Sequence, residues 1–66
     1  MEIQINGKLS TIPENLTISE LIKHLGYRQG SIAVAQNQSC VLRRDYEHTR
    51  IAQGDDIEIL APMSGG

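Results

Sequence analysis

The sequence contains no Trp and no Phe, only two Tyr, two Pro and a single Cys among its 66 residues. One cysteine cannot form an intramolecular disulfide, and it fits a reducing compartment better than an oxidising one. With two histidines it makes a poor zinc-ligand set, so we expect no metal site. Without a disulfide or a metal, a chain this short must fold on hydrophobic patterning and packing alone.

The chain also lacks a surplus of positive charge, because eight Asp and Glu oppose six Lys and Arg. Nucleic-acid binding favours a basic surface and aromatic stacking residues, so we expect no nucleic-acid partner. No apolar run approaches the roughly 20 residues that span a bilayer, and the first residues do not resemble a signal peptide. We therefore expect a cytoplasmic protein with no membrane partner.

The first residues predict a β-hairpin. Glu2 to Asn6 alternates polar and apolar residues, and Lys8 to Ile12 follows as a second strand. Between them, Asn6-Gly7 suits the positive φ angles of a type I′ turn. The segment therefore predicts two antiparallel strands joined by a short loop.

The register of this hairpin has two solutions. A two-residue loop would place Leu9 opposite Gln4, on the face away from Ile3 and Ile5. A three-residue loop would pair Ile5 with Leu9 and keep both in the core. We predict the three-residue loop, because a one-residue shift in register moves a whole apolar set to the solvent.

The next segment predicts a helix. Thr17 and Glu20 form a T-x-x-E capping box, and Leu16 and Leu21 are spaced for a hydrophobic staple across the helix start. Gly26 suits the left-handed residue that ends a helix. One apolar stripe follows from the spacing of Ile18, Leu21, Ile22 and Leu25. We expect a short helix lying on a sheet.

The second half of the chain predicts further strands and short turns, in the order Ser31–Gln36, turn Asn37-Gln38, Ser39–Leu42, helical turn Arg43–Tyr46, turn Gln53-Gly54-Asp55 and final strand Asp56–Ala61. This order predicts an α+β fold, a mixed sheet of four to five strands curved around one main helix. We expect the final strand in the middle of the sheet, beside the first. Residues 1–61 would form the domain, and residues 62–66 a flexible tail.

The end of the chain carries the candidate functional residues. If Ile57 and Ile59 face the helix, Leu60 points to the opposite face with Glu58. An exposed Leu60 next to Met63, where the tail begins, suggests a partner-binding patch. Pro62 ends the strand, and the last residues are Ser64, Gly65 and Gly66.

These features together resemble the ThiS family, the sulfur carriers of thiamin thiazole synthesis, which have a ubiquitin-like β-grasp fold. The resemblance covers the whole chain. It is carried by Asn37, the Arg43–Tyr46 turn, Gly54-Asp55-Asp56-Ile57-Glu58-Ile59 and the terminal Pro62-Met63-Ser64-Gly65-Gly66.

The resemblance implies a cycle at the terminal carboxylate of Gly66. A ThiF-type adenylating enzyme would join it to AMP, using ATP and magnesium. Sulfur from a sulfur-donor protein would displace AMP, and the thiocarboxylate would supply a ThiG-type thiazole synthase. The chain would be a cosubstrate, not an enzyme, with no bound cofactor, and a monomer when free. Its partner-binding residues would be Leu60, Pro62, Met63, Ser64 and Gly65.

This chemistry is consistent with the residues present. The chain has no Gly-x-x-x-x-Gly-Lys motif, so the ATP-binding machinery would belong to the partner. Glycines at positions 65 and 66 have no Cβ to crowd a nucleophile that approaches the terminal carbonyl.

Three other functions stay open. The chain could carry sulfur to another pathway, such as molybdopterin synthesis, where a similar tail inserts into a catalytic subunit. It could be a ubiquitin-like modifier that forms isopeptide bonds through Gly66. It could also be a β-grasp interaction module whose di-glycine end is coincidental.

We interpret the remaining reactive residues as structural or surface residues and not as functional ones. Cys40 is interpreted as a small apolar filler in a strand, and adjacent Asp55 and Asp56 as turn residues, since neighbouring strand side chains point apart. We expect the other candidates, which could have been metal ligands or steering charges, to be solvated surface residues: His24, His48, Arg43 and Arg44.

Overall fold

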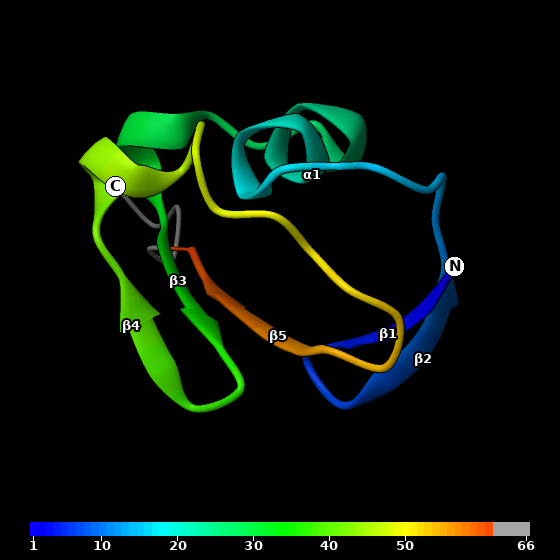
Figure 1. The fold of residues 1–66 in the computed structure, drawn as a ribbon. Coiled ribbons are helices and arrows are strands. Elements are labelled where there is room, and N and C mark those ends of the chain that lie inside the picture. Colours follow the sequence, from blue (N-terminus) through cyan, green and yellow to red (C-terminus); the bar gives the residue numbers. More distant parts are fainter. Residues whose placement is uncertain (62–66) are drawn as a thin grey trace.

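The computed structural model describes residues 1–61 as a mixed five-stranded sheet with one α-helix across one face (Figure 1). The strands are β1 (Glu2–Ile5), β2 (Lys8–Thr11), β3 (Ala33–Gln36), β4 (Ser39–Val41) and β5 (Asp56–Leu60). The helices are α1 (Ile18–Leu25) and the 3₁₀ turns η1 (Gln29–Ser31) and η2 (Arg43–Asp45). These elements confirm the predicted α+β class.

The spatial order of the strands is β2-β1-β5-β3-β4. β1 and β5 run parallel, whereas the β1–β2, β3–β4 and β3–β5 pairs are antiparallel. β5 therefore lies at the centre, beside β1, as predicted. β5 is the last described element, so the described residues end in the middle of the sheet.

The predicted register of the first hairpin is wrong. Ile5 pairs with Lys8, and Gln4 pairs with Leu9, so the loop has two residues. Asn6 and Gly7 take φ angles of 52° and 81°, as a type I′ turn requires. Leu9 is consequently 69% exposed. The geometry of the Asn-Gly turn decides the register here, at the expense of burying one leucine.

A further contact holds this turn against the sheet. The Asn6 side chain donates to the carbonyl of Ile59 at 3.2 Å and accepts from the Ile59 N–H at 2.8 Å. These two bonds extend the pairing of β1 and β5 beyond Ile5. They give Asn6 a structural role that the turn sequence alone did not indicate.

The helix begins and ends as predicted. The Glu20 N–H donates to the Thr17 hydroxyl at 3.2 Å, and the Thr17 N–H donates to the Glu20 carboxylate at 2.9 Å. This backbone bond is the main reason that the pKa of Glu20 lies below its usual value. Gly26 ends the helix with φ 86°. Leu25, predicted on the buried stripe, is 38% exposed because it lies in the last turn.

The core lies between α1 and the sheet. The sheet contributes inward side chains from its central strands, and α1 contributes its apolar stripe. Tyr46, just after η2, is only 2% exposed and its hydroxyl donates to the Ile32 carbonyl at 3.5 Å, so it closes one edge of the core. The buried hydrophobic cluster comprises Ile3, Ile12, Ile18, Leu21, Ile22, Ile32, Val34, Tyr46, Ile51, Ile57 and Ile59.

The Asp55 carboxylate joins the β3–β4 hairpin to the turn that precedes β5. It accepts hydrogen bonds from the Ala52 N–H at 2.9 Å, the Gln36 amide at 2.8 Å and the Asn37 amide at 3.1 Å. The Asn37 carbonyl oxygen in turn accepts from the Asp56 N–H at 2.9 Å. Asp55 is therefore a turn residue, as its sequence context predicted.

Burial alone would raise the pKa of Asp55. The bonds from Ala52, Asn37 and Gln36 outweigh that effect, so its pKa lies below the usual value. The carboxylate is consequently held in its charged form at neutral pH.

Candidate functional site: the open face of the sheet

The end of β5 presents one candidate binding residue to the solvent. Ile57 and Ile59 point to the helix and are buried, whereas Glu58 and Leu60 lie on the opposite, open face. Leu60 is 69% exposed, although it is a large apolar side chain at the centre of the sheet. The predicted exposure of Leu60 is confirmed.

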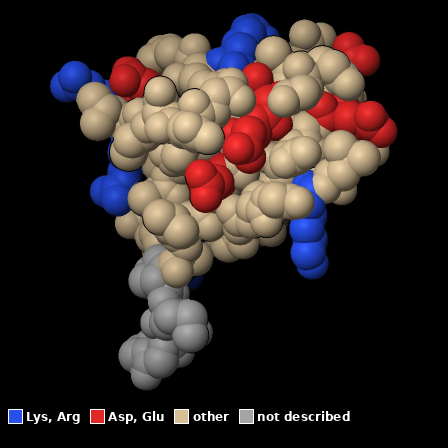
Figure 2. Space-filling view, turned by 90° about the horizontal axis from the view of Figure 1, so that it is seen from below, with Lys and Arg blue, Asp and Glu red and all other residues tan. Residues whose placement is uncertain are grey.

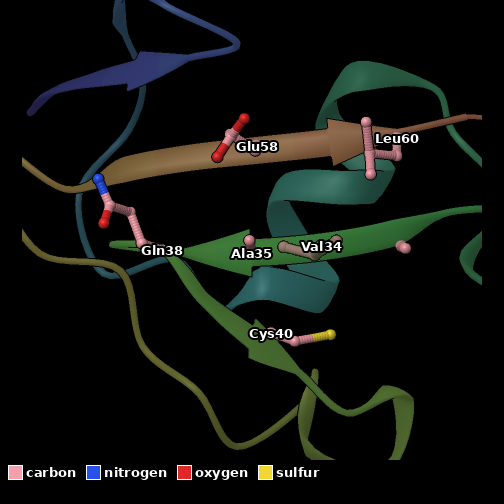
Figure 3. Close-up of a pocket in the computed structure, with 7 residues that line it drawn as sticks. Val34, Ala35, Gln38, Cys40, Glu58 and Leu60 are labelled. Carbon is pink, nitrogen blue, oxygen red and sulfur yellow. The ribbon is translucent and has the colours of Figure 1, made fainter.

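A shallow groove of about 260 Å³ lies beside Leu60 on this open face (Figure 3). Strand pairing explains it: Leu60 lies opposite Ala33, and Glu58 lies opposite Ala35, which pairs in turn with Cys40. The two alanines are too small to fill the space between the larger side chains of β5 and β4. The groove therefore has an apolar floor, with Glu58 and Leu60 along one side.

Sequence reasoning did not find this groove. Its lining residues come from three strands that are separated in the chain, and only the strand order β5-β3-β4 brings them together. The sequence signal for the groove was the pair of small residues, Ala33 and Ala35, on either side of the buried Val34. That signal indicated a sheet with little side-chain volume on one face, but not which strand lay beside it.

The interpretation of Cys40 as a buried filler is wrong. Its thiol is free and exposed on the open face, at one side of the groove. Cys40 is exposed because it pairs with Ala35, which pairs with Glu58, and all three side chains point to the open face of the sheet.

The open face is acidic as well as partly apolar. Figure 2 views the molecule from this side and shows Asp and Glu side chains in a row across it, with Lys and Arg towards the outline. Among the five strands, Lys8 is the one basic residue, and it pairs with Ile5, whose face is the helix side. The face therefore favours a partner with positive charge.

The other polar candidates lie elsewhere and are exposed, as expected: His24 on α1, His48 after η2, and Arg43 and Arg44 in η2. A second, more polar groove of about 410 Å³ lies along the outer edge of β4, between Ser39, Leu42, Asp45 and His48. Within residues 1–61, no three His, Cys, Asp or Glu side chains gather in a way that could hold a metal ion. The same residues include no helix of the length and hydropathy needed to cross a membrane.

The remaining predicted site residues are Pro62, Met63, Ser64, Gly65 and Gly66, and they lie outside the described residues. The described residues end at Ala61, directly beyond Leu60 and its groove.

Comparison with known proteins agrees with the fold. The family model described as "ThiS family" matches residues 3–66. The chain belongs to the ThiS family. It is 30% identical to the sulfur carrier protein ThiS of Escherichia coli (strain K12) over 66 residues, which cover both chains completely. It is also 30% identical over 66 residues to a thiazole synthase of Paramagnetospirillum magneticum, but spans only 20% of that longer protein.

Solved structures of the family have the same architecture. The crystal structure of the thiamine biosynthesis protein ThiS from Geobacter metallireducens matches with a TM-score of 0.85 and 32% identity, with both chains covered completely. The solution structure of a thiamine biosynthesis protein from the same organism gives a TM-score of 0.86 and 33% identity, covering 100% of this chain and 88% of that one. The mixed sheet and single helix are thus the ubiquitin-like β-grasp fold of this family.

Proposed function

We propose that the chain is a cytoplasmic sulfur carrier protein of thiamin thiazole biosynthesis. The observation that carries the proposal is the extent of the family match, which runs from residue 3 to residue 66 and so includes the di-glycine. The full-length similarity to a curated sulfur carrier supports the same function. The similarity to part of a thiazole synthase supports the destination of the sulfur.

The reacting group in this proposal is the carboxylate of Gly66. In the active site of a ThiF-type enzyme, a carboxylate oxygen attacks the α-phosphorus of magnesium-bound ATP, and pyrophosphate leaves. The resulting acyl adenylate has a good leaving group, which a free carboxylate lacks. A sulfide equivalent from a sulfur-donor protein then attacks the carbonyl carbon and releases AMP. The thiocarboxylate so formed donates its sulfur to a ThiG-type thiazole synthase.

In this proposal, the partners bind the carrier through its folded part, residues 1–61. Leu60 and its groove lie at the point where β5 ends, so a partner bound there is close to the reacting end. Gly66 follows Leu60 by six positions, and a fully extended chain of that length reaches at most about 20 Å. The proposed partner-binding residues are therefore Leu60 in the domain, followed by Pro62, Met63, Ser64 and Gly65.

The first experiment is a reconstitution with purified adenylating enzyme from the same organism, ATP, magnesium and a sulfur source. The terminal thiocarboxylate is alkylated, and the label is located by fragment mass spectrometry. Localisation is essential because exchange of one oxygen for sulfur adds nearly the same mass as oxidation of Met1 or Met63. We expect the label at Gly66.

The alternatives give different products in the same assay. Amide linkage of Gly66 to lysines of other proteins would support a ubiquitin-like modifier. A thiocarboxylate that is consumed by molybdopterin synthase, and not by thiazole synthase, would support another pathway. No change at Gly66, with an enzyme active on a different carrier, would contradict the proposal.

A further inference from the structure

The end of α1 carries an exposed run of basic and apolar residues. All six residues from Lys23 to Arg28 are exposed. Two of them, Leu25 and Tyr27, are large apolar side chains that are each 38% exposed. The other tyrosine of the chain, Tyr46, is buried in the core. Tyrosine and arginine are enriched where proteins bind one another, so we consider this run, the helix-end patch, as a docking surface.

Two backbone hydrogen bonds hold the helix-end patch in one conformation. The Gly26 N–H donates to the Lys23 carbonyl at 3.1 Å. The Tyr27 N–H donates to the Ile22 carbonyl at 3.0 Å. With Gly26 at φ 86°, these bonds form the Schellman motif that commonly ends a helix. The backbone of Tyr27 is therefore already ordered, and a partner that binds the patch does not have to order this segment.

Positive charge is concentrated in the segment that contains the patch. Residues 21–44 contain no Asp or Glu but four basic residues, Lys23, Arg28, Arg43 and Arg44. The rest of the chain contains the other two Lys and Arg and all eight Asp and Glu. The helix-end patch therefore favours a partner surface with negative charge, which the acidic open face of the sheet would repel.

The patch also lies towards the end of the sheet at which β5 stops. Arg28 precedes Ala33 by five positions, so their Cα atoms are at most about 17 Å apart, and the 3₁₀ turn η1 between them shortens this distance. Ala33 pairs with Leu60, the last residue of β5. Gly66 lies within about 20 Å of Leu60. A protein with the diameter of a small domain, about 30 Å, can therefore contact the patch and the terminal carbonyl together.

We propose that the helix-end patch binds the sulfur-donor protein while the adenylating enzyme holds Leu60 and its groove. This proposal rests on the proposed function and specifies the donor, as a protein that carries sulfur as a cysteine persulfide and has an acidic surface beside it. The sulfur has to arrive after the adenylate forms, when the adenylating enzyme still holds the carrier. Because α1 lies on the side of the sheet opposite to the open face, the patch stays accessible in that complex (Figure 1).

The chemistry of transfer allows docking to be separated from reaction. The terminal sulfur of the persulfide attacks the carbonyl carbon of the adenylate, and AMP leaves with the electron pair of the C–O bond. A dithiol then reduces the acyl disulfide so formed to the thiocarboxylate and the donor thiol, and is itself oxidised to a disulfide. Free sulfide attacks the same carbon and gives the thiocarboxylate directly. Only the first route needs a docked donor protein.

The test compares the two sulfur sources with carrier, adenylating enzyme, ATP and magnesium. One source is a cysteine desulfurase from the same organism, loaded with persulfide, and the readout is the carrier–donor acyl disulfide, measured by intact mass spectrometry before any reductant is added. The other source is sodium sulfide. We expect Arg28→Glu and Tyr27→Ala each to slow transfer from the desulfurase about tenfold, and to leave the sulfide reaction and pyrophosphate release within twofold.

Matched variants control for net charge and for folding. Lys8→Glu makes the same change in net charge as Arg28→Glu, but on the exposed edge strand β2, and it should leave transfer from the desulfurase within twofold of the unaltered chain. Tyr27→Phe keeps the apolar ring and should retain most of the rate that Tyr27→Ala loses. Thermal unfolding by circular dichroism verifies that each variant is folded.

The outcomes separate this inference from the proposed function. If Arg28→Glu reacts with the loaded desulfurase as fast as the unaltered chain, the donor does not dock on the patch and the inference is refuted. Equal slowing with desulfurase and with sulfide would also refute it, because the patch would then act on adenylation. In both cases a thiocarboxylate at Gly66 of the unaltered chain supports the carrier function. Failure of the unaltered chain to release pyrophosphate would refute both proposals.

Discussion

The Asp55 carboxylate gives the most direct test of how this small domain is held together. It is only 9% exposed, and it accepts three hydrogen bonds: from Gln36 at the end of β3, from Asn37 in the following turn, and from Ala52 before β5. Replacing Asp55 with Asn keeps the shape of the side chain but removes the charge. It also turns one acceptor oxygen into an NH₂ group that faces other donors. The substitution therefore separates the charge from the packing.

The expected loss can be worked from these contacts. A hydrogen bond to a charged group contributes about 1.5–3 kcal/mol, and a buried donor left without an acceptor costs about 1–3 kcal/mol. The Asn37 amide is partly accessible to water, and the Gln36 amide also donates to the Arg50 carbonyl at 3.0 Å, so both regain some bonding. We expect Asp55→Asn to lower the free energy of unfolding by about 2–3 kcal/mol at neutral pH.

The pH dependence follows from the lowered pKa of Asp55. A carboxyl group whose pKa is lower in the folded state contributes stability above its unfolded pKa, which is about 3.9. That contribution is lost as the pH falls from there through the folded pKa. The difference between the unaltered chain and Asp55→Asn should therefore be complete at pH 7 and shrink progressively in acid.

The assay is urea unfolding followed by far-ultraviolet circular dichroism at pH 7 and at a series of acidic pH values. Asp56→Asn is the matched control, since it is the same substitution one residue further on, at a side chain outside the hydrogen-bonded network. We expect the control to change the free energy of unfolding by less than about 0.5 kcal/mol. Equal stability of Asp55→Asn and the unaltered chain at pH 7, or a difference that does not depend on pH, would refute the reasoning.

Three further predictions test the helix start, the first turn and the terminal residue. Thr17→Ala should lower the free energy of unfolding by about 1 kcal/mol in urea titrations, whereas Thr11→Ala should cost less. Asn6→Ala should destabilise more than Asn6→Gly in thermal melts, because alanine disfavours φ 52° and both variants lose the Ile59 contacts. Gly66→Ala should fold normally but be adenylated about tenfold more slowly, equivalent to ~1.4 kcal/mol; equal pyrophosphate-release rates would contradict this.

Much of the fold was predictable because its signals are local. The capping box at Thr17 and Glu20 and the left-handed Gly26 fix both ends of the helix through contacts within a few residues. The alternation around Ile57 likewise assigns each side chain of β5 to one face. The central position of β5 beside β1 followed from the apolar character of the first and last segments.

The register of the first hairpin could not be decided in this way. Two rules made opposite predictions: burial of Leu9 favoured a three-residue loop, and the Asn6-Gly7 pair favoured a two-residue loop. The deciding contacts come from Ile59, which is more than 50 residues away in sequence and bonds to the Asn6 side chain. A tertiary contact of this kind is not visible in a local pattern.

The candidate binding face depends on that same register. With the predicted loop, Leu9 would have joined the core, and the open face would have held a single exposed leucine at the end of β5. The observed loop instead places a second leucine on the open face of the sheet, together with Leu60. Because burying Leu9 would have stabilised the fold, its exposure has a cost, which the two-residue Asn6-Gly7 turn and its contacts with Ile59 outweigh. Binding a partner at this face would recover that cost, which makes Leu9 the residue whose substitution best distinguishes a docking surface from a merely tolerated one.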